Sequence, residues 1–424
     1  MRKSQILVVT ILASAVLGIA TPRAHAQFTF NLLHTFTGGG DGNYPEGGVI
    51  QDADGNLYGT TAFGGLDCED QGCGTVFEID NNGQYTVLYR FQGGGDGAAP
   101  RAGLARDAAG NVYGTTQGQG TVGAVSTVFK VDEHGNETVL FTFGKTGDGG
   151  SANSTPILDA EGNLYGTTPA GSNTQCHLRG KIYDCGLVFR LSKSGTFKVL
   201  HTFTSPATGI NPNGNLVMDA RGNLYGTTIF GGYGGDAACG LGYNFFGCGT
   251  VFKISKDGKF TVLHVFRGKA DGSFPVGVIG DGAGNLYGIT DSGGELPCSV
   301  VLIYGCGTIF KIDNAGNFSV LHKFHPEFPG LIAYNNLFRD SQGNLYGTNQ
   351  GGGAHAGGYL FELDTKGNFT DLYDFPITSS SDGASPTGAI ISPNGDFYGT
   401  LGMGGEAGCG FEGAGCGTVF KLTP

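Results

Sequence analysis

Four side chains in this 424-residue sequence combine residue types and positions that could support catalysis. Glu46 and Asp291 are the carboxylates that flank predicted strands where a general acid or base would be accessible. Together with Arg101 and Tyr334, they are the catalytic residues we expect if the protein is a polysaccharide lyase or a glycoside hydrolase. The separation of the two carboxylates decides whether glycoside chemistry is possible, and a sequence does not contain that distance.

The sequence motifs of several common enzyme classes are missing. There is no nucleophile elbow, no HExxH zinc motif and no phosphate-binding loop. The sequence contains no tryptophan. This argues against the class of quinone-cofactor proteins that carry tryptophan docking motifs, and weakly against a lectin that stacks sugars on aromatic rings. We therefore expect binding rather than catalysis, with no cofactor and no metal ion.

A recurring heptapeptide organises the chain. Gly-Asn-Leu-Tyr-Gly-Thr-Thr, or a near copy, occurs seven times at intervals of 52 to 62 residues. The copies are marked by Asn56, Asn111, Asn163, Asn223, Asn285, Asn344 and Asp396. A period of this length in a β-rich chain is typical of a propeller or a solenoid.

Each repeat unit divides into four short predicted strands. In the first unit these are residues 47–51, 56–61, 74–80 and 84–91, and Asp-containing tight turns join the first to the second and the third to the fourth. Four antiparallel strands form one propeller blade. The sequence therefore predicts an all-β protein, a seven-bladed β-propeller.

The two ends of the chain predict how the ring closes. The seventh unit ends with its third strand at residues 417–422, and residues 28–36 match the fourth strands at 197–203 and 260–266. We therefore expect the N-terminal strand to complete the last blade, so that residues 27–424 form a single domain.

A ring of residues is expected at the mouth of the central channel, where each first strand begins. It consists of Glu46, Arg101, Asn153, Asn213, Val276, Tyr334 and Thr387. Residues expected to join the same rim are Arg106 and Arg339 in first strands, and Gln117, Asp291 and Gln350 after second strands. This polar, varied ring within a strict repeat is typical of a binding site, although loop ends under no constraint would vary in the same way.

Three sets of repeated side chains could take part in chemistry, but we interpret each set as structural. We interpret the aspartates as turn formers rather than cation ligands: Asp52, Asp107, Asp159, Asp219, Asp281 and Asp340. Four histidines share a fourth-strand position that other units fill with Tyr or Phe, which indicates aromatic packing: His34, His201, His264 and His322. The repeated tyrosines likewise indicate packing between blades: Tyr58, Tyr113, Tyr165, Tyr225, Tyr287, Tyr346 and Tyr398.

The N-terminus and the charge predict an exported protein. Residues 1–26 have a basic start, an apolar centre and an Ala-His-Ala site, so we expect a signal peptide cleaved after Ala26. Its removal takes away three positive charges, and the formal net charge changes from −12 to −15. We expect a secreted or periplasmic monomer with no membrane span and no nucleic-acid partner.

The ten cysteines form five close pairs, each between a second and a third predicted strand. The pairs are Cys68/Cys73, Cys176/Cys185, Cys239/Cys248, Cys298/Cys306 and Cys409/Cys416. An even number of cysteines in an exported chain predicts disulfides. Zinc is the competing interpretation, but no pair has a second ligand pair at the required spacing.

The compound repeat resembles a known family. The segments 247–254, 258–266 and 222–228 represent its three recurring motifs, and they are similar to the GloVer tandem-repeat family over the whole mature chain. The resemblance implies export and a repeat fold but no activity and no catalytic residues.

These observations favour a binding or interaction module. Its expected ligand is a glycan or a peptide of the cell envelope or the environment, bound at the face that carries the disulfide-linked loops. The alternatives are the enzyme described above and a structural extracellular protein that has no specific ligand.

Overall fold

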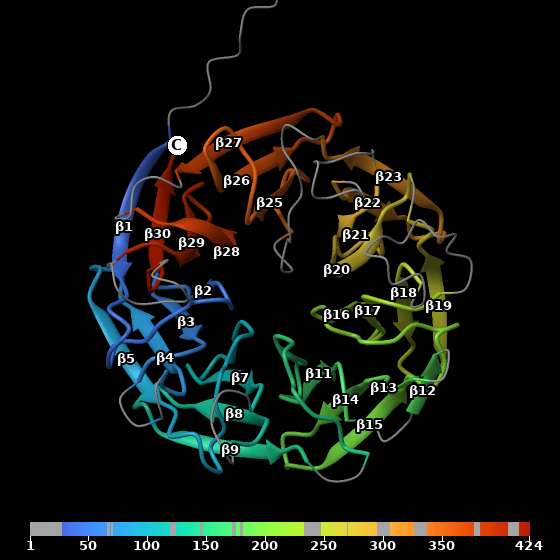
Figure 1. The fold of residues 1–424 in the computed structure, drawn as a ribbon, viewed down its shortest axis with the longest axis horizontal. Coiled ribbons are helices and arrows are strands. Elements are labelled where there is room, and N and C mark those ends of the chain that lie inside the picture. The colour runs from blue at the N-terminus through green and yellow to red at the C-terminus, as the bar shows by residue number, and fades with distance from the viewer. Residues whose placement is uncertain are drawn as a thin grey trace, which may run out of the picture.

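The computed structural model describes residues 28–65, 68, 71–118, 124–144, 147–171, 185–232, 247–268, 270–294, 306–325, 337–376, 382–405 and 415–424, and the backbone of 175–178 and 181–184. The protein is all-β. Seven four-stranded antiparallel sheets are arranged in a ring (Figure 1), so the predicted seven-bladed β-propeller is confirmed. None of the described residues belongs to a helix that is long and apolar enough to cross a membrane.

The first four blades follow one another along the chain. The first contains β2 (Val49–Gln51), β3 (Leu57–Thr61), β4 (Thr75–Ile79) and β5 (Tyr85–Arg90). The second contains β6 (Ala105–Arg106), β7 (Val112–Thr116), β8 (Thr127–Val131) and β9 (Glu137–Thr142). The third contains β10 (Ile157–Leu158), β11 (Leu164–Thr168), β14 (Leu187–Leu191) and β15 (Phe197–Thr202). The fourth contains β16 (Val217–Met218), β17 (Leu224–Thr228), β18 (Thr250–Ile254) and β19 (Phe260–Val265).

The last three blades complete the ring. The fifth contains β20 (Ser273–Gly280), β21 (Leu286–Ser292), β22 (Thr308–Ile312) and β23 (Phe318–Lys323). The sixth contains β24 (Phe338–Arg339), β25 (Leu345–Asn349), β26 (Ala356–Leu363) and β27 (Phe369–Pro376). The seventh contains β28 (Ala384–Ile391), β29 (Phe397–Met403), β30 (Thr418–Thr423) and β1 (Thr29–Thr35). In the blades whose four strands are all labelled in Figure 1, the first strand lies nearest the central axis and the fourth lies at the rim.

The two ends of the chain pair as predicted. β1 runs antiparallel to β30, with Thr29 opposite Thr423 and Leu32 opposite Phe420. Figure 1 shows the first strand, in blue, beside the last strand, in red. The N-terminal strand therefore completes the seventh blade and closes the ring.

Sequence features of the repeat explain the shape of each blade. At the centre of β3, a Cβ atom on Gly59 would lie 2.5 Å from the ring of Phe77 on β4, so glycine leaves room for this buried aromatic side chain. Phe91, Val76 and Phe129 belong to one buried cluster that joins the first and second blades. The hydrophobic core is thus a series of layers between neighbouring blades.

The repeated aspartates form turns, as predicted. Asp52 lies between β2 and β3, where its Oδ1 atom accepts hydrogen bonds from the backbone N–H groups of Asp54 and Asn56 at 3.0 and 2.9 Å. Its Oδ2 atom accepts a hydrogen bond from the Tyr58 hydroxyl at 3.1 Å. The turn thereby fixes the repeated tyrosine as well.

The histidines pack as aromatic side chains, which confirms their interpretation. Each lies on the fourth strand and stacks on an aromatic ring at the start of the fourth strand in the next blade. The pairs are His34–Tyr85, His201–Phe260, His264–Phe318 and His322–Phe369, with ring centroids 3.7 to 4.2 Å apart. Phe141 and Phe197 form the same contact at 4.1 Å. The second blade has Glu137 at the position of the accepting ring.

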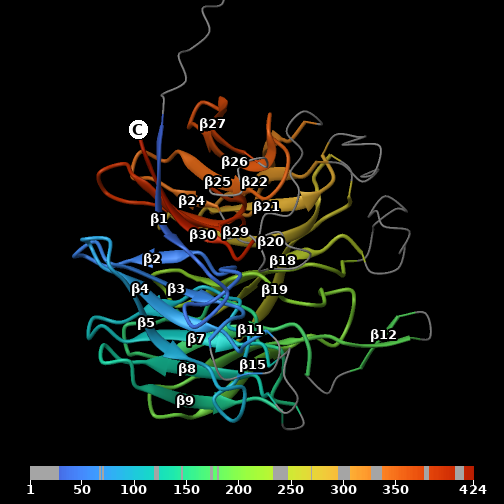
Figure 2. The same ribbon diagram turned by 60° about the vertical axis from the view of Figure 1, so that its left-hand side comes forward.

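The connections between second and third strands carry the disulfides. Cys68 and Cys73 are bonded, with their Cα atoms 5.5 Å apart. The other four second-position cysteines are also disulfide-bonded: Cys185, Cys248, Cys306 and Cys416. The side chains of their expected partners, Cys176, Cys239, Cys298 and Cys409, lie outside the described residues. In the third blade this connection forms a two-stranded hairpin, β12 (Gln175–Leu178) with β13 (Lys181–Asp184), which extends from the ring (Figure 2).

Candidate functional site

In six blades a residue with a strained backbone conformation lies shortly before the predicted channel-mouth residue. Six blades have a non-glycine residue with a φ of 50 to 64° two positions before the predicted ring residue: Tyr44, Ala99, Ser151, Asn211, Phe274 and Ser385. This left-handed conformation is unfavourable for such side chains, so other contacts must hold it. The N–H group of Ala99 donates to the carbonyl of Cys73 in the preceding blade at 2.9 Å, and Tyr44 makes the same contact with Cys416.

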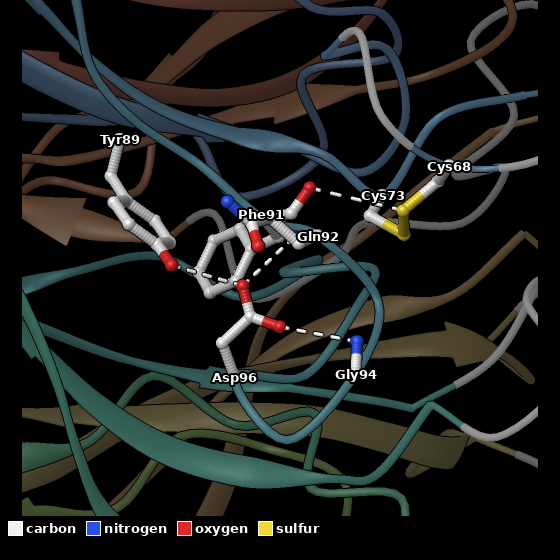
Figure 3. The surroundings of a disulfide bond; sticks show 7 residues. All are labelled: Cys68, Cys73, Tyr89, Phe91, Gln92, Gly94 and Asp96. Atoms are coloured by element: carbon white, nitrogen blue, oxygen red, sulfur yellow. Dashed lines mark hydrogen bonds between the residues drawn. A yellow bond between two sulfur atoms is a disulfide. The ribbon is translucent and has the colours of Figure 1, made fainter.

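The disulfide-linked connection and the channel mouth are therefore joined directly. Figure 3 shows the surroundings of Cys68 and Cys73, close to the loop between β5 and β6. Asp96 organises this loop by accepting hydrogen bonds from the N–H groups of Gln92 and Gly94, at 2.8 and 3.2 Å. The Tyr89 hydroxyl donates to the same carboxylate at 3.0 Å. The loop then continues through Ala99 to Arg101 at the channel mouth.

A cavity of about 80 Å³ lies at this mouth. Its side-chain walls come from four consecutive blades and the seventh: Glu46, Arg101, Asn153, Thr155, Asn213, Asn215 and Thr387. The structure thus brings together five of the seven residues predicted to form the ring. Val276 does not line the cavity, and Tyr334 lies outside the described residues.

An ion pair forms one side of the cavity. Arg101 Nη1 lies 2.7 Å from Glu46 Oε2, and the two side chains are only 22% and 19% exposed. The Arg101 guanidinium also lies 4.9 Å from the centre of the Phe63 ring, a cation–π distance. Burial raises the pKa of Glu46 above its ordinary value, although the Arg101 charge acts in the opposite direction. This side of the cavity is therefore rigid and close to neutral.

Amide and hydroxyl groups form the opposite side. Asn153 and Thr155 are separated by one buried residue, and so are Asn213 and Asn215. Residues two positions apart in an extended chain point to the same side, and all four of these side chains line the cavity. The Asn215 Oδ1 atom accepts a hydrogen bond from the Thr155 N–H group at 2.9 Å, which links the third and fourth blades. Sequence reasoning missed Thr155 and Asn215, although a spacing of two residues along a first strand was the available signal.

Two predicted rim residues lie at the other end of their strands. Arg106 is the last residue of β6, and its Nη2 atom lies 3.3 Å from an Asp52 carboxylate oxygen in the turn of the first blade. Arg339 ends β24 in the same way and lies 5.8 Å over the ring of Tyr287. A first strand runs from the channel mouth to the tight turn, so its final residue cannot reach the mouth. Their assignment to this rim is wrong.

The three predicted residues that follow second strands do not line the cavity. The N–H group of Gln117 donates to the carbonyl of Ala99 at 3.1 Å, so this residue borders the loop that leads to Arg101. Asp291 is on β21 and accepts a hydrogen bond from the Ser292 hydroxyl at 3.2 Å. Gln350 follows β25 and is partly buried. Asp291 is consequently not brought to the cavity wall where Glu46 lies.

The search for metal ligands covered only the described part of the chain. Within it, no three His, Cys, Asp or Glu side chains are grouped so that they could hold a metal ion.

The chain belongs to the Gloeobacter/Verrucomicrobia repeat family, whose profile matches residues 20–238, 177–327 and 299–424. This confirms the resemblance seen in the repeat motifs. Together with the disulfide, membership of this exported family indicates an extracellular or periplasmic protein. No curated protein matches the sequence.

Solved structures with the same architecture are distant in sequence. The extracellular domain of BT4673 from B. thetaiotaomicron has a TM-score of 0.54 at 9% identity, covering 94% of this chain and 40% of that chain. Puromycin hydrolase has a TM-score of 0.51 at 13% identity, covering 85% of this chain and 50% of the enzyme. XC5397, a gluconolactonase from Xanthomonas campestris, has a TM-score of 0.44 at 13% identity, covering 94% and 90%. At these identities the first two structures show the fold alone, and no conclusion is drawn from the third, whose TM-score is below 0.5.

Proposed function

We propose that this member of the repeat family is an exported binding module that holds a neutral polar group of a glycan or a peptide at the channel mouth. In this proposal residues 1–26 are a signal peptide cleaved after Ala26, and residues 27–424 act as one monomeric propeller domain. The ligand belongs to the cell envelope or to the environment of the cell.

The composition of the cavity carries the proposal. Asparagine amides both donate and accept hydrogen bonds, as do the Thr155 and Thr387 hydroxyls, so the wall suits sugar hydroxyls or peptide groups. The Glu46–Arg101 pair neutralises itself at 2.7 Å and attracts no particular ligand charge. One water molecule needs roughly 10–15 Å³, so a cavity of about 80 Å³ accepts the end of a ligand rather than a whole polymer.

The competing enzyme function rests on Glu46. A buried carboxyl group with a raised pKa is a common property of a general acid. Glycoside hydrolysis, however, uses a pair of carboxyl groups, and Glu46 is the single carboxylate among the described residues that line the cavity. This composition supports binding over hydrolysis. A structural protein with no ligand is the third possibility.

The test is direct binding of the mature, oxidised protein to immobilised polysaccharides, cell-envelope fractions and peptide pools. The informative variant combines Asn153→Ala with Asn213→Ala, which removes two amides from the cavity wall. Asn31→Ala is the matched control, because Asn31 is exposed on the outer strand β1. We expect the double variant to lose binding by about tenfold or more, while the control binds as the wild type does.

The same incubations distinguish the alternatives. New oligosaccharides or unsaturated sugar ends found by mass spectrometry, and abolished in Glu46→Gln, would establish an enzyme. Binding that the double variant leaves unchanged would remove the channel mouth as the site. If the folded protein binds nothing in the panel, the remaining possibility is a structural protein that has no specific ligand.

A further inference from the structure

The face opposite the channel mouth has its own repeated arrangement of charges. In each blade the second-strand tyrosine is paired across the sheet with one residue of the third strand. That residue is basic in five blades: Lys130, Arg190, Lys253, Lys311 and Lys421. In the second, third and fourth blades the tyrosine hydroxyl donates a hydrogen bond to the turn aspartate beside it, at 2.8 to 3.0 Å. In the seventh blade the cation itself forms an ion pair, with Lys421 Nζ 2.8 Å from an Asp396 carboxylate oxygen. The first and sixth blades have Glu78 and Glu362 instead.

The first blade compensates for its glutamate with a side chain from its neighbour. The Tyr58 hydroxyl lies between two carboxylates, 3.1 Å from Asp52 and 3.0 Å from Glu78. Arg106 of the second blade reaches across, with Nη2 3.3 Å from Asp52 and its guanidinium carbon 4.9 Å from the Tyr58 ring centre. The excess negative charge is thus neutralised by a guanidinium group.

The sixth blade has the same two carboxylates but no such neighbour. The Tyr346 hydroxyl lies 3.2 Å from Asp340 and 3.1 Å from Glu362. One hydroxyl proton can be donated to only one of them. At the position of Arg106 the seventh blade has Ile391, since Ile391 pairs with Phe397 as Arg106 pairs with Val112. Within the described residues, no cation forms an ion pair with Asp340 or Glu362.

A groove opens where the missing cation would lie. Its volume is about 800 Å³, and Asp340, Tyr346, Glu362 and Ile391 are among the residues that line it. Arg339 also borders the groove, but its guanidinium is directed to the fifth blade, where it lies over Tyr287 and helps to lower the pKa of Asp281. Both carboxylates line this groove, and among the described residues neither has a cationic partner.

We propose that this groove between the sixth and seventh blades binds a guanidinium group, the side chain of an arginine supplied by a partner polypeptide. Asp340 and Glu362 form an ion pair with it, as Asp52 does with Arg106 in the first blade. Phe338 and Phe397 pack against the Tyr346 ring, at centroid distances of 5.6 and 5.4 Å. The ligand is accordingly held by the carboxylates rather than by the ring.

Two observations favour this chemistry over a metal ion. The groove contributes two carboxylates, and no group of three acidic, histidine or cysteine ligands exists among the described residues. The equivalent place in the first blade is filled by an arginine of the chain itself. The formal net charge, −12 for the full chain and −15 without residues 1–26, attracts any cationic ligand and so supports a cation at this groove without distinguishing the two kinds.

The test measures binding of acetyl-Gly-Arg-Gly-amide to the mature chain by NMR titration at low ionic strength. The peptide with citrulline in place of arginine has nearly the same shape without the charge. Agmatine tests whether a free guanidinium compound binds as well as an arginine within a chain. Ile391→Arg supplies the missing side chain, and Glu362→Lys restores the residue type of the other blades. Leu158→Arg is the matched control, because Leu158 is at the position of Ile391 in the third blade.

We expect the arginine peptide to bind and the citrulline peptide not to bind. Both Ile391→Arg and Glu362→Lys should weaken binding by about tenfold or more, whereas Leu158→Arg should leave it unchanged. If either of the two variants fails to fold, Glu362→Gln, which removes only the charge, takes its place. Equal binding of the two peptides, no binding of the arginine peptide, or full binding to the folded variants would overturn the proposal.

Discussion

Replacing Glu137 by phenylalanine is expected to stabilise the propeller. At the rim, one fourth-strand ring stacks on the first aromatic residue of the next fourth strand, as His34 does on Tyr85 at 3.7 Å. Glu137 is at the accepting position of the second blade, next to Tyr89 of the first. Its Oε1 atom is buried without a hydrogen-bond partner. Phenylalanine would restore the stack and remove a poorly placed carboxylate.

The magnitude follows from two contributions. Burial, and after it the charge of Asp96, raises the pKa of Glu137 from 4.5 to about 7. Without screening, this shift would correspond to ~3 kcal/mol. Since the side chain is only partly buried, solvent screening reduces it to about 1 kcal/mol. The restored aromatic pair contributes about 1 kcal/mol more.

The first contribution depends on pH and the second does not. Below pH 4.5 the carboxyl group is protonated in both the folded and the unfolded chain, so it does not alter stability. Between pH 4.5 and about 7 the unfolded chain ionises first, and the wild type loses stability as the pH rises. We therefore expect Glu137→Phe to gain about 1 kcal/mol at pH 4 and about 2 kcal/mol at pH 8.

Urea unfolding at the two pH values measures these gains. Glu137→Gln removes the charge alone, so it should gain at pH 8 and not at pH 4. Glu133→Gln is the control, because Glu133 is exposed in the neighbouring turn and should change nothing. An equal gain for Glu137→Phe at both pH values would contradict the argument from burial, and a loss at both would contradict the argument from stacking.

Three further outcomes are expected. Deleting residues 28–36 exposes the edge of β30, so the truncated chain should aggregate in size-exclusion chromatography and melt at a lower temperature. Arg106→Leu removes the cation from Asp52, whose side chain is 3% exposed, and should lower the free energy of unfolding in urea by about 2 kcal/mol. Burial lowers the pKa of His201 from 6.5 to about 4, so the unfolded chain takes up a proton first and stability falls as the pH drops through this range. His201→Phe keeps the stack, and thermal melts from pH 7 to pH 4 should show a smaller loss.

The fold was predictable because the repeat specifies it seven times. Local patterns such as the Asp turn before β3 occur in nearly every unit, and chance errors in one copy are corrected by the others. The closure of the ring was also predictable, because the seventh unit ends with its third strand at residues 417–422 and residues 28–36 resemble the missing fourth strand. The two segments pair although they lie at opposite ends of the sequence. The predicted strands of the first blade differ from β2, β3, β4 and β5 by no more than two residues at either end.

The candidate site was only partly predictable. Glu46 and Arg101 occupy the same position in consecutive units, so ring geometry places them side by side, and they form an ion pair at 2.7 Å. Arg106 was misplaced because its position along the strand was ignored: it directly precedes a turn residue and therefore lies far from the mouth. Whether Asp291 reaches the cavity depends on the side-chain direction at the last residues of β21, which no repeat pattern specifies.

Residues that depart from the repeat are of two kinds. Some are compensated by other residues of the chain, and others lack such a partner and can mark a ligand site. Asn349 and Tyr359 stand in the sixth blade where the fifth has a buried pair of threonines, and the Asn349 amide donates to the Tyr359 hydroxyl at 3.3 Å, so the two replacements contact each other. The Asn349 Oδ1 atom is buried without a hydrogen-bond partner among the described residues. Glu78 shares the Tyr58 hydroxyl with Asp52, and Arg106 pairs with Asp52, so the extra charge of the first blade is balanced. Among the described residues no cation pairs with Glu362, which lines a groove. The Glu137 Oε1 atom has no hydrogen-bond partner among these residues, and Glu137 lines neither of the two cavities described above, so it is expected only to reduce stability. In a propeller of this kind, a ligand site is therefore indicated by a charged residue that departs from the repeat, has no partner of opposite charge and lies beside a groove.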